Sequence, residues 1–106
     1  MAVLEINGEK FKEIMQKRTD FYASQMNIIP YKVSIHDTTS RYGSNSKRTH
    51  RIAYSTILMH YSYEIIDSVI VHELAHDKVY NHSKAFYDVV YKYCPNYKLI
   101  RKKLKE

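Results

Sequence analysis

Residues 69–83 read VIVHELAHDKVYNHS, a short segment with three histidines and one glutamate. His72 and His76 are four residues apart, just over one helical turn, so both project from the same face of a helix. Glu73 follows the first histidine by roughly 100° around the helix axis, which places its carboxylate beside an ion held by the two imidazoles. The spacing therefore predicts a metal site with an adjacent base for a metal-bound water.

His82 is the candidate for a third ligand. If the helix continued from His72 to His82, the ten-residue rise would separate the two side chains by about 15 Å, too far for one ion. The helix must therefore end after His76. Asn81 tolerates the left-handed conformation found past many helix ends, and we expect it to turn His82 back towards the metal.

Three imidazoles with one open position are typical of a catalytic zinc site, whereas a structural site is closed by a fourth protein ligand, often cysteine. The chain has a single cysteine, Cys94, which excludes a cysteine-rich structural site. The helix that carries the motif is apolar nearly all round, which predicts that it is buried. Its apolar residues are Ile65, Ile66, Val69, Ile70, Val71, Leu74 and Ala75.

The segments VIVHELAH, NHSKAFYDVV and CPNYKLIRKKL together resemble the YgjP-like metallopeptidase domain, a relative of the SprT and WLM zincins. Upstream, SRYGSNS at residues 40–46 is similar to the R-W-G-S-C-S stretch of that family, and residues 51–58 resemble the strand that follows it. The resemblance covers about residues 31–104. It implies that His72, His76 and His82 are zinc ligands and that Glu73 is the catalytic acid/base.

The chain departs from the family pattern at several positions. Tyr42 and Tyr87 stand where the family has tryptophans, and Asn45 replaces the usual cysteine, so no thiol acts there. Asp77 follows the motif where an apolar residue is common; it could orient a histidine, but we prefer an exposed charge at the helix end. The histidine spacing also fits the metzincin pattern, but Val79 stands where that pattern requires glycine.

We expect one α+β domain over residues 1–106, a compact zincin-like fold with an N-terminal helix and a small, mostly antiparallel sheet. A short strand is expected at residues 2–6, with Asn7-Gly8 as a turn, followed by an amphipathic helix over residues 9–27. Residues 31–36 alternate as in a half-buried strand, and residues 51–59 predict a second strand antiparallel to it. We expect that second strand to be an edge strand along the active-site cleft, where an extended substrate would add to it. Residues 43–46 predict the turn between the strands.

The second half of the sequence predicts helices. Ser62 is the expected N-cap of the metal-binding helix, with Glu64 in its first turn. That helix should pack beneath the sheet. Ser83 is expected to cap a following helix, Pro95 to interrupt it, and residues 97–104 to form a last amphipathic helix with basic residues on its polar side.

Composition sets broad limits on function. The 106 residues are 44% hydrophobic, as in ordinary globular proteins, and contain neither a long apolar run nor a recognisable signal peptide. With one cysteine, the expectation is a cytoplasmic protein that does not contact a membrane. The net charge is +6, with basic clusters that we interpret as solvated faces, although such faces also attract nucleic acid. These clusters are Lys47, Arg48 and Arg51, and Lys98, Arg101, Lys102, Lys103 and Lys105.

The leading hypothesis is a zinc-dependent metallopeptidase that hydrolyses peptide bonds in peptide or protein substrates, with Zn²⁺ on the three histidines and a zinc-bound water activated by Glu73. One alternative is a nucleic-acid-associated, SprT-like module whose zinc helix supports a basic face. Another is a latent zinc-binding scaffold without turnover. The candidates for stabilising the oxyanion, by residue type alone, are Tyr54, His60, Tyr80 and Tyr87.

Overall fold

Four α-helices and a three-stranded sheet make up the computed structural model, which describes residues 8–105. The strand expected at residues 2–6 and the turn expected to begin at Asn7 therefore lie outside the described residues. The elements in chain order are α1 (Gly8–Gln25), β1 (Lys32–His36), β2 (Gly43–Ser46), β3 (Arg51–Ser55), the 3₁₀ helix η2 (Thr56–His60), α2 (Tyr63–Ala75), α3 (Lys84–Tyr93) and α4 (Tyr97–Lys105).

The sheet has the strand order β1-β3-β2, with β3 in the centre. β1 pairs with β3 in parallel, from Lys32 opposite Arg51 to His36 opposite Ser55, and β2 pairs with β3 antiparallel. The prediction that residues 51–59 form a strand antiparallel to the first was therefore wrong. That segment is also not an edge strand, and it is a strand only to Ser55. The edge strand beside α2 is instead β2, at residues expected to form a turn.

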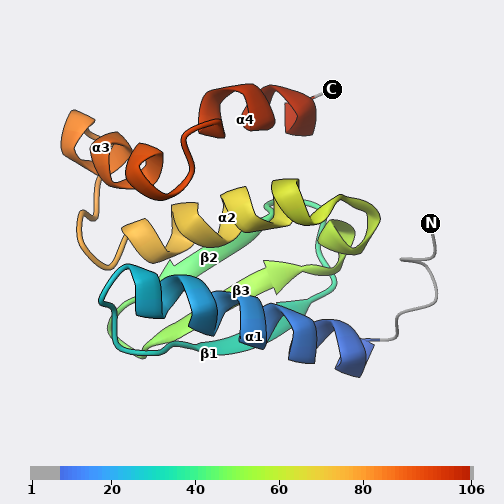
Figure 1. The fold of residues 1–106 in the computed structure, drawn as a ribbon. Helices are drawn as coiled ribbons and strands as arrows, with labels where there is room; N and C mark the ends of the chain where they lie inside the picture. The colour runs from blue at the N-terminus through green and yellow to red at the C-terminus, as the bar shows by residue number, and fades with distance from the viewer. Residues whose placement is uncertain (1–7, 106) are drawn as a thin grey trace.

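The helices form two layers: α1 and α2 lie on the sheet, and α3 and α4 lie on α2 (Figure 1). α1 contacts β1 and α2, while α2 contacts β2, so the two longest helices lie on the same face of the sheet. α3 and α4 pack against α2 on the side away from the sheet. α2 is consequently enclosed by the sheet and the other helices, which confirms the buried helix expected from its all-round apolar sequence.

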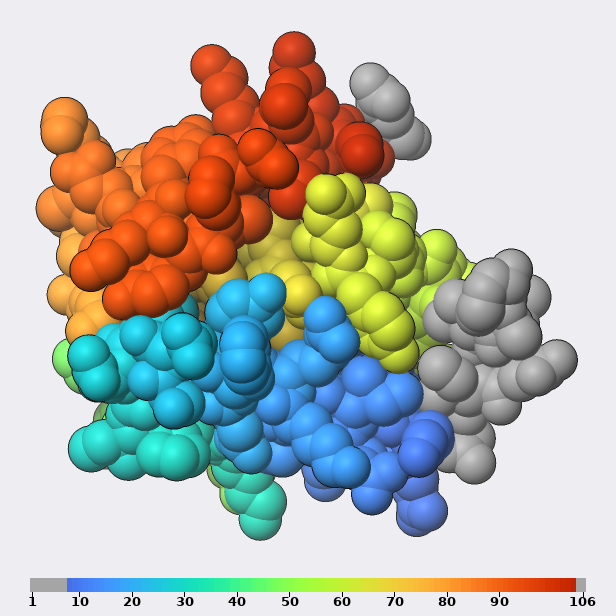
Figure 2. Space-filling model, viewed as in Figure 1, coloured from blue at the N-terminus to red at the C-terminus, as the bar shows by residue number. Residues whose placement is uncertain are grey.

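Burial within α2 is nearly continuous. Ile70, Val71, Leu74 and Ala75 have no exposed surface, and the buried set also includes Glu73. In the space-filling view, the atoms of α1 cover the lower front of the molecule and those of α3 and α4 the upper part, with α2 visible between them (Figure 2). The motif-bearing helix is therefore largely enclosed, and its C-terminal end lines an open hollow.

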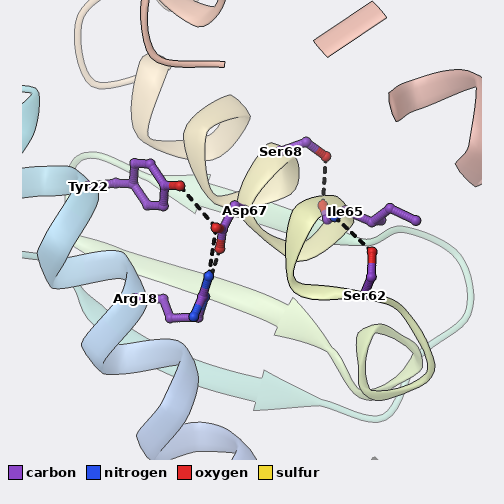
Figure 3. Close-up of polar contacts among 6 residues, drawn as sticks. All are labelled: Arg18, Tyr22, Ser62, Ile65, Asp67 and Ser68. Carbon is purple, nitrogen blue, oxygen red and sulfur yellow. Dashed lines mark hydrogen bonds and ion pairs between the residues drawn. The ribbon is translucent and has the colours of Figure 1, made fainter. Parts of the chain in front are cut away.

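A polar contact joins α1 to α2 beside this core (Figure 3). The Arg18 guanidinium donates two hydrogen bonds of 2.7 Å to the two carboxylate oxygens of Asp67, and the Tyr22 hydroxyl donates a third of 2.9 Å. The guanidinium also lies 4.2 Å from the centre of the Tyr63 ring. A paired, two-point contact of this kind fixes direction as well as distance, so it sets the register of α1 along α2.

Within residues 8–105, none of the helices combines the length and the hydropathy that crossing a bilayer requires.

Candidate metal centre and active site

α2 begins and ends as its sequence suggests. The Ser62 hydroxyl accepts a hydrogen bond from the backbone N–H of Ile65, and Glu64 lies in the first turn, so the predicted N-cap is confirmed. His72 lies in the last turn and His76 is the C-cap. The two rings are 5.2 Å apart, centre to centre, which is the neighbouring arrangement expected for residues four apart on a helix.

The chain turns at the end of α2 without the left-handed residue that we expected. Among the described non-glycine residues, only Asn27 and His50 have positive φ, so Asn81 is not left-handed and that prediction was wrong. The last turn instead tightens, with the N–H of Asp77 donating to the carbonyl of Leu74 at 2.9 Å. Residues 79–83 then leave the helix and bring His82 back over its end.

The three histidines converge on one point. Each offers a ring nitrogen, and these atoms all lie within 4.8 Å of one another; Nε2 of His72 and Nε2 of His82 are 3.3 Å apart. The Val79 carbonyl accepts a hydrogen bond of 3.3 Å from Nδ1 of His76, which leaves the lone pair on Nε2 of that ring free. The buried ring of Phe86 packs against all three imidazoles.

The donor set fits a metal ion that binds neutral imidazole. Burial lowers the pKa of His72 to about 3 and also lowers the pKa of His76, so both rings are uncharged and available as ligands at neutral pH. Three nitrogen donors that leave a position open suit zinc in its tetrahedral geometry. Within residues 8–105, these three histidines are the group whose donor atoms are close enough together to hold an ion.

Glu73 lies beside the histidine cluster, 7% exposed, against the edge strand β2. The Asn45 side-chain amide donates to the Glu73 carbonyl at 2.8 Å. At Gly43 a Cβ atom would come within 3.3 Å of the Glu73 side chain, so the small residue allows the strand this close approach. Burial raises the pKa of Glu73 to about 7, an effect that the positive charges of Arg101 and Arg41 oppose. The carboxyl can thus gain or lose a proton near neutral pH.

Two hollows meet at the histidines. The first, of about 510 Å³, runs between β2 and the loop at Tyr80–His82 and is floored by His72, Glu73 and His76. The second, of about 710 Å³, opens between α3 and α4 and has His72 and His82 in its wall. An extended chain lying across the histidines would therefore reach both.

The structure places Asp77 and the three residues that depart from the resembled family pattern, Tyr42, Asn45 and Tyr87. Asp77 accepts a hydrogen bond of 2.6 Å from the Tyr31 hydroxyl and is half-buried, so neither the exposed charge we preferred nor a histidine-orienting carboxylate describes it. Tyr42 donates to the carbonyl of Leu104 at 3.1 Å. Asn45 holds β2 to α2 through the amide contact described above, and Tyr87 lines the second hollow.

The four residues considered for oxyanion stabilisation lie in different places. Tyr80 lines the first hollow and is 85% exposed, and Tyr87 lines the second. Tyr54 is fully buried, with its hydroxyl 2.8 Å from that of Thr19, and His60 is an exposed residue of η2 that lines neither hollow. Tyr54 and His60 are therefore unsuited to the role.

Tyr97 is the contact that sequence reasoning missed. Its hydroxyl lies 2.6 Å from Nδ1 of His72, and its ring is 5.9 Å from that imidazole. The sequence predicted only that Tyr97 begins the amphipathic helix over residues 97–104. No local pattern relates it to His72, because the two residues are 25 positions apart and meet only once α4 packs on α2.

Two archaeal proteins of known structure share this fold. The crystal structure of the metallopeptidase zymogen abylysin of Pyrococcus abyssi aligns with a TM-score of 0.77 at 22% identity, over 85% of this chain and 90% of its own. That of the metallopeptidase zymogen jannalysin of Methanocaldococcus jannaschii gives a TM-score of 0.71 at 22% identity, over 85% and 96%. The α+β architecture of this chain is thus the fold of these two proteins.

A model of the YgjP-like metallopeptidase domain matches residues 2–106, nearly the whole chain. The chain therefore belongs to the YgjP-like metallopeptidase family and is a protease, which confirms the resemblance that its sequence suggested. None of the curated proteins matches it significantly.

Proposed function

We propose that this metallopeptidase is zinc-dependent, that His72, His76 and His82 hold the zinc, and that Glu73 is the acid/base. The observation that carries the proposal is the convergence of three imidazole donors within 4.8 Å of one another, beside a buried carboxyl that lines the same hollow. When bound, zinc supplies an electrophile that polarises a carbonyl group and lowers the pKa of water.

Glu73 has the properties that proton transfer in this hollow requires. Its carboxyl is shielded from solvent, and burial brings its pKa to about 7, so it can accept a proton and later release it to a leaving amine. A bound dication would favour the ionised carboxylate and so prepare it to act as a base. Asn45 and Gly43 keep β2 against the same residue, which limits where the carboxylate can move.

β2 offers a way to bind the substrate. It is an edge strand of the sheet, and Gly43, Ser44 and Asn45 line the hollow that contains the histidines. An extended peptide can add to such an edge through main-chain hydrogen bonds, which are independent of its sequence. In our proposal the substrate is therefore a peptide or an unfolded protein segment lying along β2 and across the histidines.

A mixed peptide digest tests the proposal. Zinc-loaded wild type should generate new peptide termini, detected by mass spectrometry, whereas Glu73→Gln should retain zinc and generate none. Cleavage that persists unchanged in Glu73→Gln would remove that residue from the mechanism. If the wild type binds zinc but cuts nothing, the latent zinc-binding scaffold becomes the better description.

A further inference from the structure

The second hollow, which we call the α3/α4 groove, differs in chemistry from the first. Its wall consists of the two histidines and, from α3 and α4, three tyrosines and three cations. The groove starts at His72 and His82, which also line the first hollow, so a substrate bound at the histidines can extend into it. The residues that α3 and α4 contribute are Tyr87, Tyr91, Tyr97, Lys98, Arg101 and Lys102.

The cations come from one face of one helix. Lys98, Arg101 and Lys102 are spaced three and four residues apart on α4, which places them side by side along the groove. Among residues 8–105, no carboxylate lies within ion-pair distance of any of the three. Like charges at this spacing repel one another, so a negatively charged ligand in the groove would relieve the repulsion.

Lys103 on the same helix has a different environment. It pairs with Glu64 at 3.6 Å and does not line the groove. Lys103 is thus paired within the protein, whereas no carboxylate of residues 8–105 lies within ion-pair distance of the three groove cations. This difference also supplies a matched control, because Lys98, Lys102 and Lys103 carry the same charge on the same helix.

The tyrosines give the groove a fixed wall. Tyr97 is 5% exposed, and its ring packs against those of Tyr87 and Tyr91 at 6.3 and 6.1 Å between centres. The Arg101 guanidinium lies 5.7 Å from the centre of the Tyr97 ring and is half-buried, so one cation is held in place while the two lysines are exposed. Because the Arg101 guanidinium has a fixed position in the wall of the groove, it suits a carboxylate ligand, which it can bind through two hydrogen bonds.

We propose that the α3/α4 groove binds an acidic side chain of the peptide substrate, on one side of the bond to be cut. This inference rests on the proposed function, because the same histidines join the groove to the site of cleavage. A polynucleotide fits the observations less well, because it would need a longer row of phosphate contacts than one groove provides. The second basic cluster, Lys47, Arg48 and Arg51, lines neither hollow.

Matched peptides provide the test. Each peptide carries Glu, Gln or Lys at one position near the cleaved bond, and kcat/KM is measured with zinc-loaded protein. We expect kcat/KM for the Glu peptide to exceed that for the Gln peptide by about tenfold at one or two positions on one side of the bond. This is the effect expected when several cations contact one partly exposed carboxylate. Lys98→Glu and Lys102→Glu should each reduce or reverse that preference, while Lys103→Glu should keep it. Equal rates for Glu and Gln at every position would overturn the proposal.

A binding measurement separates this proposal from the proposed function. A fluorescein-labelled peptide of alternating Glu and Ala is titrated with the Glu73→Gln protein, and its anisotropy is followed without any need for turnover. Binding that Lys98→Glu and Lys102→Glu weaken, and Lys103→Glu does not, would support the groove even if no peptide is cleaved. Tighter binding of a single-stranded oligonucleotide of equal charge, lost in the same two variants, would overturn it and assign the groove to nucleic acid.

Discussion

At the scale of single residues, His72 has different partners at its two ring nitrogens. Nε2 faces Nε2 of His82, where the three histidines converge, and Nδ1 lies 2.6 Å from the Tyr97 hydroxyl. If Nε2 is to offer its lone pair to a metal, Nδ1 must carry the proton and donate it to the Tyr97 oxygen. In the proposed site, Tyr97 is therefore a positioning residue that fixes both the tautomer and the orientation of the His72 ring.

We expect Tyr97→Phe to weaken zinc binding by roughly 10–100-fold, because the ring of His72 loses its hydrogen-bond partner. Competition with a chromophoric chelator measures the dissociation constant. Tyr91→Phe is the matched control, since Tyr91 lines the same groove but makes no hydrogen bond to a histidine among the described residues. An unchanged zinc affinity in Tyr97→Phe would show that packing alone orients His72.

The buried carboxyl of Glu73 makes the stability of the metal-free protein depend on pH. Folding raises the pKa of Glu73 from 4.5 to about 7, so between these pH values the folded state holds a proton that the unfolded state has lost. The free energy of unfolding therefore falls as the pH rises from about 4.5 to 7. At pH 8 the folded protein contains a buried, ionised carboxylate. Replacing Glu73 by the uncharged Gln should therefore stabilise the metal-free protein there.

At pH 8 we expect Glu73→Gln to raise the free energy of unfolding of the metal-free protein by about 2–3 kcal/mol. This gain should shrink towards zero near pH 4, where the carboxyl is protonated in both the folded and the unfolded state. Urea unfolding of both proteins in the presence of a chelator, at several pH values, gives the difference directly. A gain that is the same at pH 4 and pH 8 would point to packing rather than to the charge.

At the scale of elements, α1 is attached to α2 through Arg18, Tyr22 and Asp67 (Figure 3). Asp67→Asn removes the negative charge from this contact while keeping the side-chain shape. We expect a loss of about 2 kcal/mol in the free energy of unfolding, because hydrogen bonds to charged groups contribute about 1.5–3 kcal/mol and this pair is only partly exposed. Denaturant unfolding measures the change.

Glu64→Gln is the control for that prediction. Its partner Lys103 and Glu64 itself are 61% and 55% exposed, so the loss should stay below about 0.5 kcal/mol. Similar losses in both variants would mean that the Arg18–Asp67 contact behaves as an ordinary surface ion pair.

The sequence predicted elements well where the signal was local and poorly where it depended on distant pairing. α2 was placed correctly from its apolar residues and the cap at Ser62, and β1 from its alternation. Alternation carries no information about strand direction, however, so the parallel pairing of β1 with β3 could not be inferred. β2 is built from Gly, Ser and Asn, which disfavour strands, and it forms because β3 supplies a pairing partner.

The same limit applies to the candidate site. Spacing predicted that His72 and His76 share a helix face, and the structure brings His82 to the same point, but by a tightened last turn rather than by a left-handed Asn81. The left-handed asparagine after a helix occurs instead at Asn27, after α1. Tyr97 and the groove cations approach His72 through the packing of α4, which leaves no trace in the local sequence.

At the scale of the whole molecule, the proposed zinc ligands join two parts of the fold. His72 and His76 belong to α2, the most buried helix, whereas His82 lies in the loop that leads to α3 and is exposed. A metal bound by all three ties that loop, and through it α3, to the core. Because the cluster exists only in the folded state, zinc binding should stabilise the entire structure.

Zinc at a thousand times its dissociation constant should add about 4 kcal/mol to the free energy of unfolding. For a chain of this length, that gain corresponds to a Tm increase of about 15 °C. His82→Ala should leave the Tm of the metal-free protein nearly unchanged, since its side chain is exposed, but should remove most of the zinc-dependent increase. Calorimetry with zinc and with chelator, on both proteins, checks this. A full zinc-dependent increase in His82→Ala would leave only α2 as the binding element, and the loop would then need another reason to fold back over the helix end.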